Sequence, residues 1–277
     1  MSRLWIEHTA WLTRRHVLLA SGPRINVGQK KGTPQLHRAH AAVQPVGDDA
    51  VLRLQQLLAH APRGSLGLDQ LHLLMGAPWV RYAVMPWQTS LKREADWEGY
   101  ARVLLAQQYG VATDTWRIRV APGGFGQARL AAAVDQGLFQ TVYEMARASK
   151  LRLSQCEPLL ITAINRHHAR LKAREFVLVL LEAEYATCLF FNKGWHSVIT
   201  QPYATPPHHA PDADQITALV RDAAVLGGET MPAQIYVSSS DIPLSSLSGQ
   251  GPIQWLGGVH PRFSQPIDLR AAVEVAA

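Results

Sequence analysis

EFVLVLLEAEYATCLFFNKGWHSVITQP, residues 175–202, is the stretch that decides the fold. Its first part, Phe176 to Leu181, is six consecutive apolar residues bounded by charged ones, which is typical of a strand buried on both faces in the middle of a sheet. Residues 185–191 and 195–200 favour two more strands, and Asn192-Lys193-Gly194 between them offers a glycine for the left-handed position of a hairpin turn. The sequence therefore predicts three strands in series, the last two antiparallel.

A capped amphipathic helix is predicted after these strands. Pro211-Asp212 opens a segment with apolar residues at three- and four-residue spacing, and Gly227-Gly228 closes it. Residues 234–237 then favour another strand. The resulting order, β-β-β-α-β, is that of a ribonuclease H-like half-domain.

The same order is predicted near the N-terminus, so we expect an α/β fold made of two copies of one unit. In each copy an acidic residue follows the predicted first strand, Glu7 in one copy and Glu182 in the other. Folds of this type place phosphate-handling carboxylates there. The predicted N-terminal elements are strands at 3–6, 10–14, 16–20 and 71–75, with a long loop over 21–47 and a helix capped by Asp48.

The middle of the chain favours an inserted subdomain. A strand over 79–85, a helix over 94–109 ended by Gly110, and a strand over 116–120 form a β-α-β piece within residues 79–126. A long helix over 127–149, a strand over 151–155 and a helix from Glu157-Pro158 are predicted next. We expect the first lobe to span residues 1–157, including this insertion, and the second lobe to span 158–277.

Composition and charge exclude several classes of protein. The chain has 277 residues, 47% of them hydrophobic and 17% charged, which is ordinary for a globular protein with a real core. Two cysteines without partner motifs fit a reducing cytosol, and no apolar run approaches the ~20 residues that span a bilayer. A formal charge of +6 allows an acidic partner. The basic cluster at Arg166 to Arg174 is explained by the end of a helix, so nucleic-acid binding is not expected.

Motifs for catalysis are weak. There is no Gly-x-x-x-x-Gly-Lys-Ser/Thr loop, and Gly123-Gly124-Phe125-Gly126 lacks the context of a dinucleotide fingerprint and is interpreted as a flexible turn. A ribonuclease H-like nuclease needs three or four carboxylates around metal ions, and Glu7 stands almost alone in its unit. We therefore expect neither a nuclease nor a metal site.

The layout of the chain resembles the actin-like cytoplasmic proteins of type IV pilus machines, the PilM family, and the related cytoplasmic domains of type II secretion GspL proteins. The resemblance covers nearly the whole chain and is carried by its arrangement. One matching segment runs from LLMGAP at 73–78 to YAVMPW at 82–87, where the inserted subdomain begins. The others are QCEPL at 155–159, which precedes a helix, and the three-stranded meander that starts at Phe176.

The departures from that family concern its nucleotide site. The resemblance places Glu7-His8-Thr9 at the first phosphate motif, where the family has Asp, and Glu182-Ala183-Glu184 at the second, where the family has Asp-x-Gly. Ser238-Ser239-Ser240 stands at the adenosine-side Gly-Gly turn. A glutamate in place of glycine blocks close approach of the backbone to phosphate and repels its charge. The predicted nucleotide cleft, with Glu7, Thr9, Glu182, Glu184, Ser238 and Ser239, is therefore degenerate, and we expect no ATP or magnesium cofactor.

The resemblance implies a cytoplasmic docking component of a pilus or type II-like secretion apparatus that is not an enzyme. Its partner would be the tail of an inner-membrane assembly protein, or a secretion ATPase, and it would reach the membrane only through that partner. The alternative is an active actin-like ATPase or a sugar kinase relative. Aromatic and arginine residues dominate interface hot spots, so the predicted partner-binding residues lie in the inserted subdomain: Trp79, Arg81, Tyr82 and Trp87.

Overall fold

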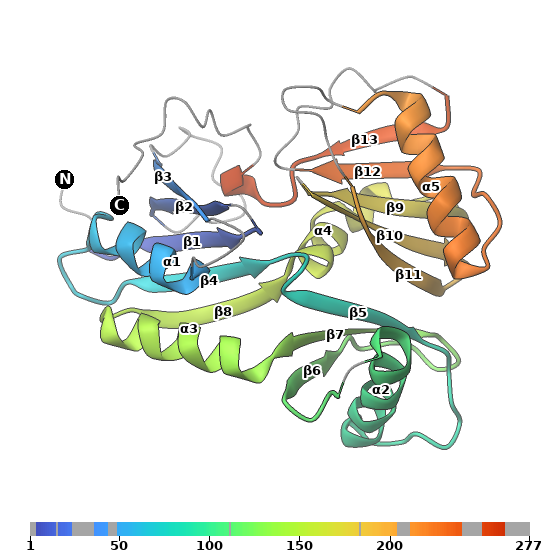
Figure 1. Cartoon of the computed structure of the whole chain (residues 1–277), viewed down its shortest axis with the longest axis horizontal. Coiled ribbons are helices and arrows are strands. Elements are labelled where there is room, and N and C mark those ends of the chain that lie inside the picture. Colours follow the sequence, from blue (N-terminus) through green and yellow to red (C-terminus); the bar gives the residue numbers. More distant parts are fainter. Residues whose placement is uncertain are drawn as a thin grey trace. The chain divides into compact units, whose positions relative to one another are not determined.

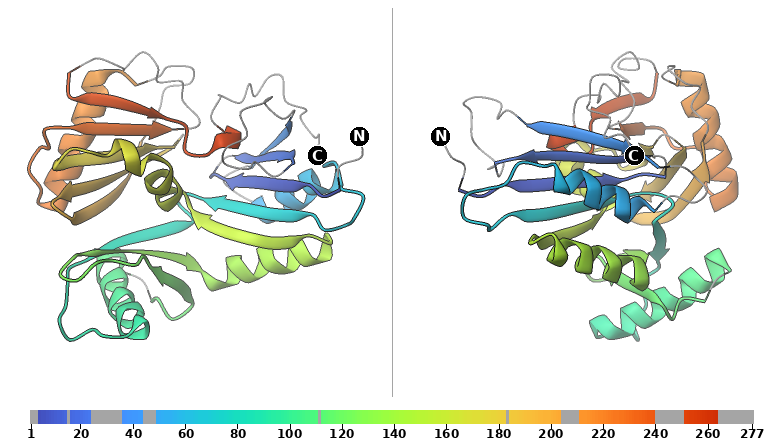
Figure 2. Two further views of the ribbon diagram at one scale, coloured as in Figure 1. Left: turned by 180° about the vertical axis from the view of Figure 1, so that it is seen from behind. Right: turned by 60° about the vertical axis from the view of Figure 1, so that its left-hand side comes forward.

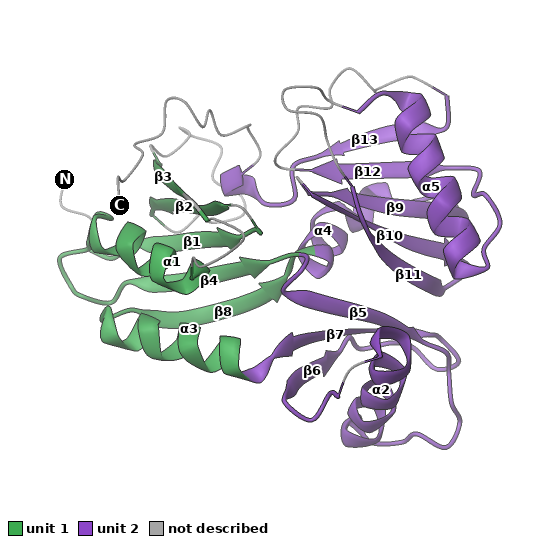
Figure 3. Ribbon diagram, viewed as in Figure 1, with its two compact units in different colours: residues 1–76, 137–159, 267–277 green, residues 77–136, 160–266 purple. Residues whose placement is uncertain are grey.

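The structure is a computed structural model that describes residues 4–14, 16–23, 36–43, 49–110, 112–182, 184–203, 211–239 and 251–263. The chain divides into two compact units (Figure 3). The first comprises residues 1–76, 137–159 and 267–277, and the second comprises residues 77–136 and 160–266. In the described part of the chain, no helix has both the length and the apolar character needed to cross a membrane.

The first unit contains a five-stranded sheet in the order β3-β2-β1-β4-β8 (Figure 1). Its strands are β1 (Glu7–Leu12), β2 (His16–Gly22), β3 (His37–Ala42), β4 (Gln70–Met75) and β8 (Arg152–Pro158). The first three form an antiparallel meander, and β4 and β8 run parallel to β1. Helices α1 (Ala50–Ala59) and α3 (Gln136–Ala148) lie on one face of this sheet (Figure 2).

The second unit contains a five-stranded sheet in the order β11-β10-β9-β12-β13. Its strands are β9 (Glu175–Leu181), β10 (Tyr185–Asn192), β11 (Trp195–Pro202), β12 (Ile235–Ser239) and β13 (Ile253–Gly257). Val177, Val179 and Leu181 pack under α5 (Ala213–Gly227), which Asp212 caps as predicted. On the other face Phe176, also from β9, stacks on Phe191 of β10. Both faces of β9 are thus buried, as its unbroken apolar run predicts.

The two sheets share one topology, an antiparallel meander followed by two strands parallel to its first strand. In each sheet a helix joins the third strand to the fourth, α1 in the first unit and α5 in the second. The predicted duplication of a β-β-β-α-β unit, and with it the predicted α/β fold class, is confirmed.

A third sheet, β5-β7-β6, belongs to the second unit. It consists of β5 (Val80–Met85), β6 (Trp116–Val120) and β7 (Arg129–Asp135), covered by α2 (Glu94–Tyr109). Helix α2 has the predicted bounds, and Gly110 ends it in the left-handed conformation with φ of 62°. Trp97 and Leu105 of α2 are buried against Ala131 and Ala133 of β7. The division of the chain into lobes at residue 157 stays a prediction.

The predicted strands over 16–20 and 71–75 correspond to β2 and β4, but the predicted first strand and the predicted long loop over 21–47 are wrong. The described residues 4–6 precede the first strand, which begins at Glu7, and β3 lies within the region predicted to be a long loop. The three polar residues Glu7, His8 and Thr9 suggest that a strand ends there. His8 and Thr9 are nevertheless fully buried inside β1, and Nδ1 of His8 is hydrogen-bonded to Oγ of Ser21 on the neighbouring strand at 2.8 Å. Tertiary pairing overrides the local pattern here.

The predicted helix over 127–149 is also wrong in its first third, because residues 129–135 form strand β7 and α3 begins at Gln136. The run of alanines at 131–133 has no clear hydrophobic period, so helix and strand cannot be told apart there. Their small side chains allow α2 to pack closely on the sheet.

Two smaller corrections concern turns and caps. Asp49, not Asp48, caps α1, and in the hairpin after β10 the left-handed residue is Lys193, with φ of 57°. The helix after Pro158 is α4 (Leu159–His167).

Candidate functional site

Glu182 lies in the turn that joins β9 to β10, at the position that the resemblance assigns to the second phosphate motif. Its side chain is 3% exposed, and its Oε2 accepts a hydrogen bond from the backbone N–H of Ala77 at 3.1 Å. Its own N–H donates to the carbonyl of Tyr185 at 2.9 Å. Glu182 therefore ties the start of the third-sheet segment to the end of β9, and its carboxylate is engaged by protein.

Tyr82 extends this connection. Its hydroxyl accepts a hydrogen bond from the N–H of Leu160, at the first turn of α4, at 3.2 Å. Burial raises the pKa of the Tyr82 phenol above its ordinary value, and the charge of Glu182 raises it further. Tyr82 thus stays neutral and fixes β5 to α4, so it has a structural role in the second unit.

The first unit has a turn of the same length between β1 and β2. Leu12 pairs with Val17 across this turn, as Leu181 pairs with Ala186 across the other, so four residues lie between the partners in each case. The residue equivalent to Glu182 is therefore Thr13. Its N–H donates to the carbonyl of His16 at 2.9 Å, as that of Glu182 donates to Tyr185.

The described polar groups of both turns bond to other protein groups. Both lack glycine, and the Thr13 hydroxyl closes its turn by donating to the His16 carbonyl at 2.8 Å and accepting from the His16 N–H at 2.9 Å. In the other turn Glu184 is half-buried, and its carbonyl accepts the N–H of Tyr203 at 2.7 Å. Phosphate sites need inward-pointing N–H groups and close backbone approach. Thr13 bonds within its own turn, whereas Glu182 and Glu184 bond to Ala77 and Tyr203 from other segments.

Glu7 and Thr9 are placed differently from what the sequence suggests. Glu7 begins β1, whereas Glu182 follows the end of the equivalent strand β9. The expectation that both acids follow their strands is therefore wrong for Glu7, because β1 starts later than predicted. Thr9 lies in the middle of β1 and is fully buried. Their assignment to a nucleotide cleft stays a prediction, without support from their positions in the strand.

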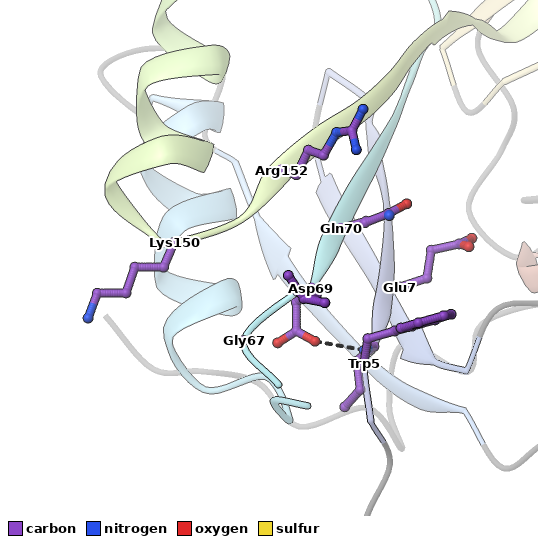
Figure 4. Close-up of a pocket in the computed structure, with 9 residues that line it drawn as sticks. Trp5, Glu7, Gly67, Asp69, Gln70, Lys150 and Arg152 are labelled. Atoms are coloured by element: carbon purple, nitrogen blue, oxygen red, sulfur yellow. Dashed lines mark hydrogen bonds between the residues drawn. The ribbon is translucent and has the colours of Figure 1, made fainter. Parts of the chain in front are cut away.

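Glu7 instead lines a pocket of about 310 Å³ at the end of the first sheet where β1, β4 and β8 begin (Figure 4). Trp5, Leu68 and Gly67 form its apolar side, and Gln70 and Arg152 stand beside Glu7. Sequence analysis missed this pocket, since its residues come from three separate segments.

Ser238 and Ser239 end β12 and are buried. The Ser238 hydroxyl donates to the carbonyl of Gly257 at 2.9 Å and lies 3.3 Å from Nε2 of His167. Burial, with the charges of Arg166 and Arg170, lowers the pKa of His167 to about 4, so this imidazole is neutral at physiological pH. These groups join α4 to the second sheet. Ser240 lies outside the described residues.

The predicted partner-binding arginine, Arg81, lies against two aromatic rings. Its guanidinium carbon lies 4.6 Å from the centroid of Tyr109 and 5.7 Å from that of Trp116. Stacking on ring faces stabilises a partly buried guanidinium in place of the carboxylate or carbonyl that its strand position suggests. The hydroxyl of Tyr109 in turn donates to the carbonyl of Tyr82 at 3.0 Å.

Trp79 and Trp87 are both half-buried. Trp87 contacts Trp97 of α2 and, edge to face at 5.1 Å, Phe125. Phe125 lies between β6 and β7 and is 91% exposed, more than any other large apolar side chain in the described part of the chain. Of the four predicted partner-binding residues, Trp87 is thus the one next to a markedly exposed apolar group.

Within the described ranges, no group of three or more His, Cys, Asp or Glu side chains could hold a metal ion. Cys156 and Cys188 form no disulfide among the described residues, and burial raises the pKa of the Cys188 thiol to about 12, so this thiol stays protonated.

No family model and no curated protein matches the sequence. The fold does have known counterparts. A Bacteroides thetaiotaomicron protein with an actin-like ATPase fold and unknown function aligns over 96% of this chain and 95% of its own, with a TM-score of 0.55 and 8% identity. The fold is actin-like. The duplicated sheets described above agree with this assignment.

Two further actin-like structures come from assembly machines. The cytoplasmic domain of EpsL, an inner-membrane component of the type II secretion system of Vibrio cholerae, aligns over 93% of this chain and 92% of its own, with a TM-score of 0.55 and 10% identity. A structure of the PilM-PilN type IV pilus biogenesis complex aligns over 93% of this chain and 88% of its own, with a TM-score of 0.56 and 14% identity. At these identities the likeness establishes the fold, and it confirms the resemblance at that level.

Proposed function

We propose that this actin-like chain is a non-catalytic docking component of a type IV pilus or type II secretion-like assembly. Its partner in this proposal is the cytoplasmic tail of an inner-membrane protein, and the chain reaches the membrane through that partner. A secretion ATPase is a further partner that the resemblance implies.

The observation that carries the proposal is the hydrogen bond from Ala77 to Glu182. The carboxylate at the second phosphate position is 3% exposed and its Oε2 accepts the N–H of Ala77, which favours a structural role over holding magnesium or a phosphate. The equivalent turn in the first unit, at Thr13, closes on itself. A scaffold role requires neither turn to bind nucleotide.

The choice of machine rests on the fold neighbours. One of them is a complex of PilM with PilN, and another is the cytoplasmic domain of an inner-membrane component.

The docking surface in this proposal lies on the third sheet, where the predicted residues Trp79, Arg81, Tyr82 and Trp87 are found. Tyr82 is 1% exposed and bonds to Leu160 of α4, and Arg81 is stacked on Tyr109, so neither is a direct contact residue in this proposal. Trp87 and Phe125 offer a contact of two rings, with the guanidinium of Arg129 6.0 Å from the Trp87 ring centroid. Aromatic and arginine side chains of this kind are typical interface anchors.

Photo-crosslinking in cells tests the proposal. Benzoylphenylalanine replaces Phe125 in the full chain, and the crosslinked product is identified by mass spectrometry. We expect an inner-membrane protein joined through its cytoplasmic segment, and we expect Trp87→Ala to reduce its yield severalfold.

The matched control is benzoylphenylalanine at Val103, an apolar side chain of α2 that is 54% exposed. A crosslink of equal yield from Val103, or a product that is a soluble enzyme at both positions, would contradict the proposal.

A further inference from the structure

The pocket at the start of β1, β4 and β8 contains a row of three polar side chains. The parallel register places Glu7 beside Gln70 and Gln70 beside Arg152. Residues in register on neighbouring strands share a face and lie about 4.8 Å apart. Figure 4 shows the three side chains extending to the same side of their strands, with the Trp5 ring next to Glu7. An acceptor, an amide and a guanidinium thus stand side by side.

The wall of this pocket is held rigidly by Asp69. This side chain is 3% exposed, and its Oδ1 accepts the N–H of Ile6 at 2.7 Å. The N–H of Gly64 lies 3.2 and 3.1 Å from its two oxygens. A Cβ at position 64 would lie 2.5 Å from the Cα of Trp5, so only glycine permits this close approach. The pocket is therefore preformed.

The rim of the pocket is unusually apolar for a protein surface. Trp5 is 47% exposed and Leu68 59%, and both line the pocket. Leu4 and Leu66 beside them are 60% and 54% exposed, and the N–H of Leu66 donates to the carbonyl of Leu4 at 3.0 Å. Exposed apolar residues gathered in this way, with polar groups around them, mark interaction sites.

The charges of the pocket favour a carboxylate. Arg152 has no ion-pair partner among the residues that the structure describes, and Lys150 lines the same pocket. The carboxylate of Asp69 is already engaged by backbone N–H groups, which leaves Glu7 as the opposing charge. A guanidinium fork binds a carboxylate in two parallel hydrogen bonds.

We propose that this pocket is a docking site for an extended peptide segment of a partner protein that combines a bulky apolar side chain with a carboxylate. The apolar side chain packs on Trp5 and Leu68, and the carboxylate pairs with Arg152. Glu7 and Gln70 face the peptide backbone, whose N–H and C=O groups suit an acceptor and an amide. The site lies in the first unit, apart from the third-sheet surface described above, and does not depend on it.

The observations favour a peptide over a membrane surface or a nucleotide. Glu7 repels a phosphate group, which carries more negative charge, more strongly than a single carboxylate, and a peptide also brings an apolar side chain to Trp5 and Leu68. The volume of about 310 Å³ is at the lower end of the range for ligand sites, which suits a few side chains.

The test selects peptides from a phage-displayed random seven-residue library on the immobilised full chain. We expect enrichment of sequences with Leu, Phe or Trp close to Asp or Glu. The most enriched peptide is then synthesised with a fluorescent label, and its affinity is measured by anisotropy. Trp5→Ala and Arg152→Glu should each weaken binding by about tenfold or more, and Arg152→Lys by less.

Arg221→Glu, the same charge reversal at an exposed position of α5, is the matched control and should change the affinity less than about twofold. In 5-fluorotryptophan-labelled protein, which has eight tryptophans, the ¹⁹F signal that Trp5→Phe removes should be the one that the peptide shifts. Circular dichroism confirms that each variant is folded.

Three results would overturn the proposal. The first is that no peptide is enriched, or that the enriched peptides bind Trp5→Ala with unchanged affinity. The second is Trp5-dependent binding to phosphatidylglycerol vesicles without a peptide, which would assign the surface to the membrane. The third is Trp5-dependent dimerisation in sedimentation, which would assign it to a second copy of this chain. None of these results bears on crosslinking from Phe125.

Discussion

Replacing Glu182 by alanine removes the acceptor that holds the N–H of Ala77. Glu182 is 3% exposed and its Oε2 is 3.1 Å from the Ala77 nitrogen, so the N–H would be left buried without this partner. A hydrogen bond to a charged group contributes about 1.5–3 kcal/mol. Since ~1.4 kcal/mol corresponds to a factor of ten in an equilibrium constant, local opening should become about 10- to 100-fold more frequent.

Hydrogen exchange of this one amide measures the effect. Gly76-Ala77 is the only Gly-Ala dipeptide in the sequence, so labelling glycine with ¹³C at its carbonyl and alanine with ¹⁵N isolates its signal. Exchange at Ala77 should accelerate about 10- to 100-fold in Glu182→Ala. Glu182→Gln keeps a carbonyl acceptor and should accelerate it less. Equal exchange rates in wild type and Glu182→Ala would refute our reading of this turn.

Three other predictions follow from the same structure. Millimolar MgATP should leave the Tm of the protein unchanged. A ligand present at 100 times its Kd adds about 2.7 kcal/mol to the free energy of unfolding, so a bound nucleotide would be detected. A magnesium-dependent rise in Tm of several degrees would contradict a degenerate nucleotide cleft and favour an ATPase or sugar kinase. Lys150, two residues after the end of α3, has a φ of 56°, so Lys150→Gly should stabilise the chain by about 1 kcal/mol in urea unfolding. A loss of stability would show that the lysine side chain contributes more than its strained backbone costs. The pKa of His167 falls from 6.5 in the unfolded chain to about 4 in the folded one, so the unfolded chain takes up a proton at higher pH. The free energy of unfolding should therefore decline as pH falls from 6.5 to about 4, and His167→Gln should make this decline smaller. An unchanged pH profile in the variant would contradict this prediction.

The second sheet and α5 were predictable from sequence because their local signals agree with their tertiary environment. The apolar run at 176–181 is long enough to specify a doubly buried strand, and Asp212 and Gly228 cap α5 with side-chain and backbone chemistry that sequence alone reveals. The same holds for α2, which Gly110 ends. Where capping residues and periodicity coincide, element bounds are right within one or two residues.

The first unit was less predictable because its polar residues are buried by pairing that no local pattern encodes. His8 and Thr9 interrupt an apolar run yet lie inside β1, so the strand was displaced and Glu7 was assigned to the wrong end of it. One available signal was the equal spacing of the two hairpins, which identifies Thr13 as the counterpart of Glu182. The pocket at Trp5 and Arg152 depends on the register of three strands and could not be found without the structure.

The two ends of the segment that forms the third sheet lie close together. Val80 at the start of β5 pairs with Val134 near the end of β7, so the whole segment between β4 and α3 begins and ends within about 5 Å. To the first sheet, the segment is therefore equivalent to a single short loop, and its length has little effect on the register of β4 and β8. This segment can therefore be replaced or altered during evolution with little effect on the stability of the duplicated sheets. The condition is that the hydrogen bonds from Ala77 to Glu182 and from Leu160 to Tyr82 are kept.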